Sequence, residues 1–136
     1  MPKQSGLGWT TFSVDDSAGT ARDIRNDTTN LDWTMPRGVQ DSTGIDKSAM
    51  ERILLLADFS GNASGVFNPT ATTSSHAVLK TVPSTSVNRT VSIAIAAQTL
   101  ANECLINDYA LTRAQSGEFT WQAPFQLADG VVPTWS

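Results

Sequence analysis

The sequence predicts a mainly β domain with two packed antiparallel sheets, a β-sandwich or barrel, flanked by one short α-helix. Most segments alternate apolar and polar side chains with the period of two that is typical of half-buried strands. Gly, Pro, Asn and Asp separate these segments at short intervals, as turns do. Helical spacing of apolar residues is clear in one segment, residues 48–57. A chain of 136 residues has the length of one domain, which we expect to span 1–136.

The N-terminal third is expected to hold an irregular arm, three strands and a loop. Residues 1–8 contain two glycines and a proline and predict a flexible arm. Alternating residues predict strands at 9–14, 21–24 and 28–35. Pro36 and Gly38 end the third strand, because proline lacks an N–H for the ladder and glycine favours a turn. The following residues, to Gly44, are expected to form a long loop.

The expected helix begins near Ser48. Ser48 and Glu51 have the S-x-x-E spacing of a capping box, and Asp46 adds negative charge at the positive end of the helix dipole. The apolar residues follow at positions i, i+3, i+4 and i+7. We therefore expect one helix face to pack on the sheet, and this face consists of Met50, Ile53, Leu54 and Ala57.

A strand with an unusual face follows at residues 59–67. Phenylalanine stands at both ends of this face, and Gly61, Ala63 and Gly65 form its middle. Glycine in a strand often marks the close approach of another backbone. We expect the helix to pack over these small residues, and a ligand contact is the alternative interpretation.

The remaining elements are mostly strands. Residues 75–82 fit either one helical turn or a short strand. Alternation predicts strands at 90–96, 105–112 and 119–127, and Pro124 predicts an edge position or a bulge in the last of them. Residues 131–136 are expected to form a short C-terminal tail.

Composition and motifs argue against several functional classes. The net charge is −4 and Lys and Arg are scattered, which disfavours tight binding to nucleic-acid phosphates. Glycine-rich phosphate loops, catalytic serine motifs and paired-cysteine metal patterns are missing from the sequence. Cys104 alternates with Ile106 and is expected to be a small buried hydrophobe, and His76 has no ligand partner at a suitable spacing. We expect no enzymatic activity, cofactor or metal. No segment has the apolar length of a membrane span.

The chain resembles the tail tube (major tail) proteins of long, non-contractile-tailed bacteriophages, particularly those of actinobacteria. Three blocks carry the resemblance: SVDDSAGTARDIRNDTTNLDW (13–33), TGIDKSAMERILLLADFSGNASGVFNP (43–69) and RTVSIAIAAQTLANECLINDYALTRAQSGEFTWQAPFQLADGVVPTW (89–135). They cover most of the chain. None is a catalytic signature, so the ordered combination of blocks makes the match specific.

The resemblance implies a structural subunit of the virion tail. Six copies would close into a ring, and rings would stack into a hollow tube through which viral DNA passes into the host without specific binding. Assembly would take place in the host cytoplasm, with a tape measure protein and a tail terminator as partners and no membrane. The family's stacking contacts map here to the arm 1–8, the loop 33–45 and the tail 131–136; the residues expected to make them are Trp33, Arg37, Asp41 and Trp135.

Two other functional classes stay open from the sequence. A tail terminator, a head decoration protein or another virion part of similar fold would share these features, and a terminator would stop at a single ring. An enzyme or ligand-binding β-domain would depend on the chain's reactive side chains, His76 or Cys104.

Overall fold

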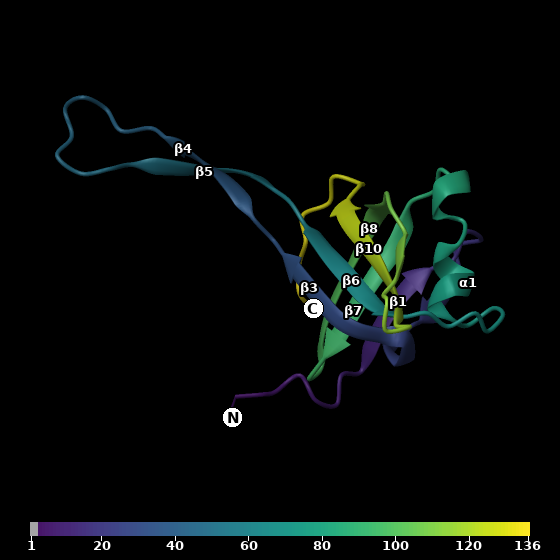
Figure 1. Ribbon diagram of the computed structural model, residues 1–136. Helices are drawn as coiled ribbons and strands as arrows, with labels where there is room; N and C mark the ends of the chain where they lie inside the picture. Colours follow the sequence, from purple (N-terminus) through teal and green to yellow (C-terminus); the bar gives the residue numbers. More distant parts are fainter. Residues whose placement is uncertain (1–2) are drawn as a thin grey trace.

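The computed structural model describes residues 3–136, which form two antiparallel sheets, one short α-helix and two 3₁₀ turns. The strands of the larger sheet are β1 (Thr11–Asp15), β2 (Ala21–Asp23), β3 (Thr28–Thr34), β6 (Ser60–Val66), β7 (Arg89–Ile95), β8 (Gln98–Ile106), β9 (Ala110–Arg113) and β10 (Phe119–Leu127). Their order is β2-β1-β7-β8-β10-β6-β3, and β9 pairs with β10. The smaller sheet is a hairpin of β4 (Arg37–Asp41) and β5 (Arg52–Ala57), which projects from the body as a long arm (Figure 1). The predicted fold class is confirmed in being mainly β with one helix and two antiparallel sheets. The expected packing of the two sheets into a sandwich is not seen, because the smaller sheet is the projecting hairpin and the core lies within the larger sheet.

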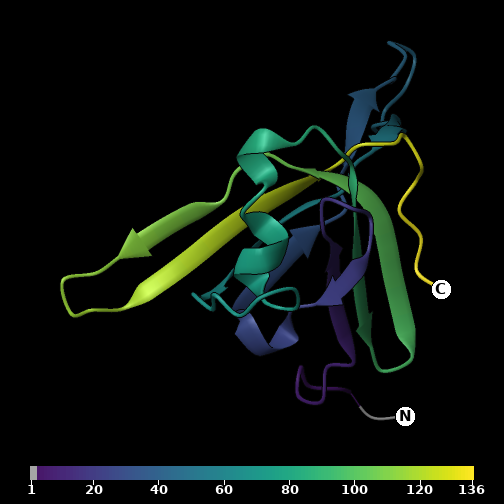
Figure 2. The ribbon, with the colours of Figure 1, turned by 90° about the vertical axis from the view of Figure 1, so that its right-hand side faces the viewer.

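The larger sheet curls around a single core. Inward side chains of β1, β6 and β10 meet there because each strand alternates apolar-in and polar-out. Phe59, Val91, Ile93, Leu100 and Cys104 are fully buried in the same cluster. The helix α1 (Ser75–Leu79) lies over one side of the curled sheet (Figure 2), where Val78 and Leu79 are buried. The segment 75–82, which the sequence left open between helix and strand, is therefore helical at its start.

A buried arginine fastens this helix to the sheet. The Arg89 guanidinium, 2% exposed, donates hydrogen bonds to the carbonyls of Asp15 and Val78 at 2.9 and 2.8 Å. It also donates to the hydroxyls of Thr81 and Thr85. Its partners come from β1, from α1 and from the residues around the 3₁₀ turn η2 (Val82–Ser84), so one side chain links three elements.

A buried aspartate holds the other end of α1. Asp27, in the 3₁₀ turn η1 (Arg25–Asp27), accepts hydrogen bonds from the Ser75 N–H and the Asn68 side-chain amide, each at 2.8 Å. The Ser74 hydroxyl caps the helix by accepting from the Ala77 N–H. Two groups thus satisfy N–H donors that the first helical turn leaves unpaired.

The helix predicted within residues 48–57 is wrong, because this segment forms β5 and the arm tip. The capping box of Ser48 and Glu51 does not form; instead, the Thr43 hydroxyl accepts from the Glu51 N–H and donates to the Glu51 carbonyl. At the arm root, the Asp58 N–H donates to the Pro36 carbonyl. The proposed helix face does not pack on the sheet: Met50, Ile53 and Leu54 are exposed and Ala57 is half-buried.

The small-residue face of β6 is tight for a different reason from the one predicted. The sequence suggested a helix over Gly61 and Gly65, but the backbone of the neighbouring β3 region lies there. A Cβ on Gly65 would collide with the Asp27 carbonyl, and one on Gly61 would collide with the Asp32 carbonyl and the Phe125 ring. The glycines therefore permit close packing between β6 and its neighbours.

The predicted strand 105–112 is two strands. β8 begins earlier than expected, at Gln98, and ends at Ile106, and β9 begins after a break at residues 107–109. Pro124 of β10 stands opposite this break, since β10 pairs with β9 up to Gln122 and with β8 from Phe125. Because no strand pairs with β10 at Pro124 on this side, the missing N–H of Pro124 costs no ladder hydrogen bond. The edge position or bulge expected at Pro124 is thus a gap between two partner strands.

The predicted loop 33–45 is partly ordered as strand. β3 continues to Thr34 and β4 occupies Arg37–Asp41, so the irregular part is short. Of the predicted arm 1–8, residues 1–2 lie outside the described residues, and Lys3–Gly8 form neither strand nor helix. Within residues 3–136, no helix has the length and apolar character needed to cross a membrane.

Candidate assembly surface

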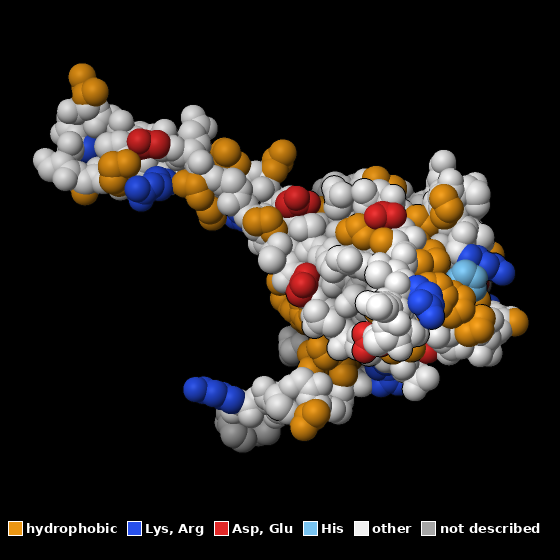
Figure 3. Space-filling view, viewed as in Figure 1, with side chains coloured by type: hydrophobic (Ala, Val, Ile, Leu, Met, Phe, Trp, Pro, Cys, Tyr) orange, Lys and Arg blue, Asp and Glu red, His pale blue; other side chains and the backbone are white. Residues whose placement is uncertain are grey.

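The arm is the most prominent exposed apolar feature of the described chain (Figure 3). β4 and β5 pair in register from Val39↔Leu54 to Asp41↔Arg52, with a bulge between Arg37 and Val39. The Arg37 side chain donates to the Leu55 carbonyl at 3.0 Å and bridges this bulge. The Asp41 carboxylate accepts from the Thr43 N–H, which orders the turn into the arm tip.

Both faces of the arm are apolar. Successive residues of a strand point to opposite faces, so Leu54 and Leu56 share one face with Val39, while Ile53 and Leu55 lie on the other. Leu54 is 58% exposed, Ile53 51% and Leu56 90%. A strand that is apolar on both faces is typical of one covered on both faces. Within residues 3–136 no other segment covers the arm, so the apolar side chains of both faces are exposed.

Three tryptophans gather where the arm leaves the body. Trp33, at the end of β3, lies edge-on to Trp9 with ring centroids 5.7 Å apart. Trp135, from the C-terminal tail, lies 6.4 Å from Trp33 and is 37% exposed. Tryptophan is enriched among the residues that dominate binding energy at protein interfaces. This tryptophan cluster (Trp9, Trp33 and Trp135) gives the arm a rigid, partly exposed aromatic base.

The C-terminal tail reaches the cluster by pairing with a sheet edge. Ser136 and Thr99 exchange two backbone hydrogen bonds of 2.9 Å, which places the tail end beside the start of β8. At the start of the tail, Val131 and Val132 are exposed. The tail is thus apolar but poorly covered, as the arm is.

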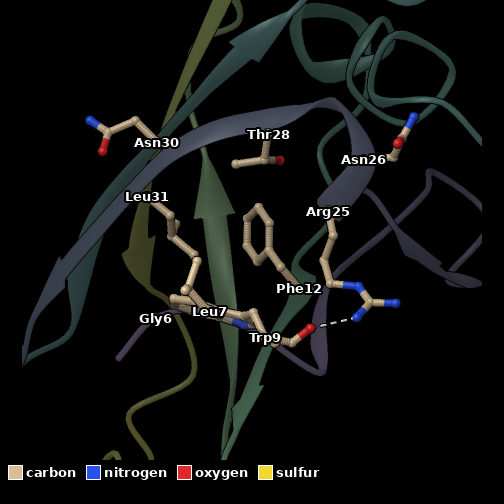
Figure 4. A pocket seen from close by; sticks show the side chains of 10 residues that line it. Gly6, Leu7, Trp9, Phe12, Arg25, Asn26, Thr28, Asn30 and Leu31 are labelled. Carbon is tan, nitrogen blue, oxygen red and sulfur yellow. Dashed lines mark hydrogen bonds between the residues drawn. The ribbon is translucent and has the colours of Figure 1, made fainter. Parts of the chain in front are cut away.

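A groove of about 700 Å³ lies beside the tryptophan cluster, between the segment Gly6–Phe12 and β3. Figure 4 shows Phe12 and Leu31 on its two walls and Trp9 near one end. Arg25 closes the groove on one side and donates to the Trp9 carbonyl at 2.6 Å. The lining of the groove is mostly apolar or neutral polar, and Arg25 is the charged side chain among the described residues that line it.

The residues predicted as stacking contacts lie in one region of the subunit. Trp33 and Trp135 lie together at the arm root, and Arg37 and Asp41 lie at the two ends of β4 in the arm. Their contact with another subunit stays a prediction. The apolar arm residues were instead assigned to a helix face. The uninterrupted run Ile53–Ala57 was the available signal for a strand covered on both faces, and helical spacing within it was the competing one.

Comparison with known proteins identifies the fold. No protein-family model and no curated protein matches the sequence. Among solved structures, the chain is similar to one from the tail of an empty gene transfer agent (GTA) particle, refined helically with C6 symmetry. The TM-score is 0.72 and the sequence identity 16%, over 98% of each chain. A chain in the virion of a native GTA particle matches with a TM-score of 0.70 and 16% identity, over 97% of this chain and 99% of that one. The resemblance predicted from the sequence is confirmed at the level of the fold.

Proposed function

We propose that this chain is the structural subunit of a phage-like tail tube. Six copies form a ring, rings stack into a hollow tube, and viral DNA passes through the bore. The single observation that carries the proposal is the arm, whose two apolar faces are exposed in the isolated subunit. The fold shared with a chain in a C6-symmetric tail supports the same conclusion. A structural role of this kind requires no catalytic group and no cofactor.

The reach of the arm suits contact with more than one copy. Roughly ten residues lead from the arm root to its tip, five of them in β4, and an extended chain at about 3.3 Å per residue reaches at most about 35 Å over that length. A domain of about 100 residues has a radius of gyration of about 13 Å, which implies a similar width of roughly 35 Å. An arm as long as the body is wide can insert between a neighbour in its own ring and a subunit of the next ring, with one apolar face against each.

The predicted stacking residues take definite roles in this proposal. Trp33 and Trp135 form an aromatic contact at the arm root, where a neighbouring subunit would bury the exposed part of Trp135. Arg37 and Asp41 act within the arm, where their hydrogen bonds keep the bulge and the tip in shape. The segment before β1 and the C-terminal tail flank the same region and would become ordered contacts on assembly.

The proposed location is the virion tail, after assembly in the host cytoplasm. A tape measure protein inside the tube would set its length, and a terminator would cap its end. Genomic DNA would cross the bore without specific binding. The second candidate is a tail terminator or a related virion part, which the same arm would also serve if copies formed one ring only.

Electron microscopy of the purified chain at rising concentration, beside light scattering for mass, tests the proposal. Tubes with a regular axial repeat are the expected result. Single rings that never stack would favour the terminator. A monodisperse monomer at every concentration would contradict self-assembly and favour the ligand-binding alternative.

Matched variants of the arm separate its role from its stability. Leu54→Ser with Leu56→Ser removes both leucines from the face that they share with Val39, and Gln40→Ser changes an exposed polar residue of the same hairpin. We expect the double variant to remain folded and monomeric, and the control to assemble like the wild type. Tubes of normal length from the double variant would show that this face makes no essential contact.

A further inference from the structure

One face of the larger sheet differs from the rest of the surface in its chemistry. The outward side chains of β9, β10, β6 and β3 form four rows across the strands. The first row is Thr112, Thr120 and Val66, and the second is Ala110, Gln122, Ser64 and Asn30. The third row is Pro124, Asn62 and Asp32, and the fourth is Gln126, Ser60 and Thr34. We call these thirteen positions the polar wall.

The polar wall has little charge. Asp32 is its single ionisable side chain, and none of its positions carries Lys or Arg. Most of the others are Ser, Thr, Asn or Gln. Figure 3 views the molecule from the side on which β3 and β6 lie. White, uncharged side chains fill much of the middle of the body, Asp and Glu lie around them, and Lys and Arg lie on the arm, the N-terminal segment and the right-hand part of the body.

This composition fits neither an outer surface nor an interface between subunits. Outer surfaces that keep proteins soluble carry roughly 25–35% charged residues, and the polar wall has one. Interface cores are apolar and rich in aromatic residues, and Val66 is the only large apolar side chain on the wall. The arm and the tryptophan cluster already supply the apolar contacts.

We propose that the polar wall lines the bore of the tube and faces duplex DNA. Binding of DNA is driven by Lys and Arg that neutralise phosphates and release counterions. Neutral hydroxyls and amides stay hydrated and give the phosphates no fixed partner, and Asp32 repels them. Such a wall lets the duplex slide without holding it. The inference rests on the proposed function and adds to it the residues that face the DNA.

Size-selective labelling of assembled tubes tests the assignment. Thr120→Cys and Gln122→Cys place a thiol at exposed positions of the wall, and Ser86→Cys places one in the exposed loop after η2. The native Cys104 is completely buried and gives a silent background. Each tube is treated with a small maleimide and, separately, with a maleimide on a polyethylene glycol chain too bulky to enter the bore. Unfolded subunits, which react with both, are the control for reagent activity.

The wall thiols in tubes should react with the small reagent and not with the bulky one. Reaction with both would place the wall on the exterior, and reaction with neither would place it between subunits; either result would overturn the assignment while leaving the tube intact. Absence of tubes from the wild type would overturn the proposed function and the assignment together. As a second readout, Gln122→Lys tubes should retain added duplex DNA fragments and Ser86→Lys tubes should not. Equal retention would also refute the assignment.

Discussion

Replacement of Arg89 by Met should destabilise the fold strongly, although none of the carboxylates within residues 3–136 forms a salt bridge with this arginine. Burial lowers the pKa of Arg89, because removing the guanidinium from water disfavours its charged form. Its hydrogen bonds to four oxygens offset this desolvation cost. Met has an aliphatic side chain of similar shape but cannot donate a hydrogen bond to any of these four oxygens. The Val78 carbonyl is buried with this bond, and a buried unsatisfied acceptor costs about 1–3 kcal/mol.

The remaining partners add less. The Asp15 carbonyl and the two threonine hydroxyls are partly accessible, so each lost bond costs about 0.5–1.5 kcal/mol before water or a rotated hydroxyl replaces it. Relief of the buried charge offsets part of the sum. A net loss of about 2–4 kcal/mol in the free energy of unfolding follows.

Urea unfolding followed by tryptophan fluorescence, at a concentration where the chain is monomeric, measures this loss. Arg22→Met is the matched control, because Arg22 is partly exposed and pairs with Asp16 at 3.3 Å; a pair of this kind is worth about 0–1 kcal/mol. A loss below about 1 kcal/mol for Arg89→Met would refute the view that this side chain fastens α1 to the sheet.

Three further predictions concern single residues. Gly65→Ala should lower the free energy of unfolding by about 1–3 kcal/mol, because the new Cβ meets the backbone of Asp27. Gly6→Ala is the control and should be neutral, because its Cβ meets no atom within 4 Å. Equal stability of the two variants would contradict the close approach at Gly65. Asp27→Ala should weaken α1, seen as faster amide exchange at Ser75, and unchanged exchange there would count against the cap. Burial, followed by the charges of Glu103 and Asp129, raises the pKa of Cys104 to about 12 from 9.0, so the folded state keeps a proton that the unfolded state releases. The free energy of unfolding should therefore fall between pH 9 and pH 12, and this fall should be smaller in Cys104→Ala. A Cys104 thiol that reacts readily in the native protein would refute the view that this side chain is buried.

The sequence was sufficient where one face of a strand is buried and the other is wet. In β7 and β10 this alternation is strict, and both strands lie within a residue of their predicted bounds. It failed at β5, whose residues are apolar on both faces because no part of its own chain covers them. A short apolar run then satisfies a helical template equally well.

The candidate site shows the same division. Trp33 and Trp135 were predicted to contact neighbouring subunits, and this stays a prediction. The sequence did not show that the two rings lie together within one subunit or that Trp9 joins them. Pairing between residues far apart along the chain brings these rings together, and no local pattern records it. The polar wall was equally hidden, because its rows exist only once the register between strands is known.

The arm also bears on how an assembly of these subunits would grow. A subunit that extends an arm to the next copy and receives one from the previous copy forms a directional polymer. Its two ends are then chemically unlike: one presents free apolar hairpins, and the other presents vacant docking sites. A capping partner has to match one end alone. The hairpin end carries unpaired strand edges and is the end at which unwanted association is most favourable. Growth that begins from a preformed base and buries each new arm promptly would keep that end protected.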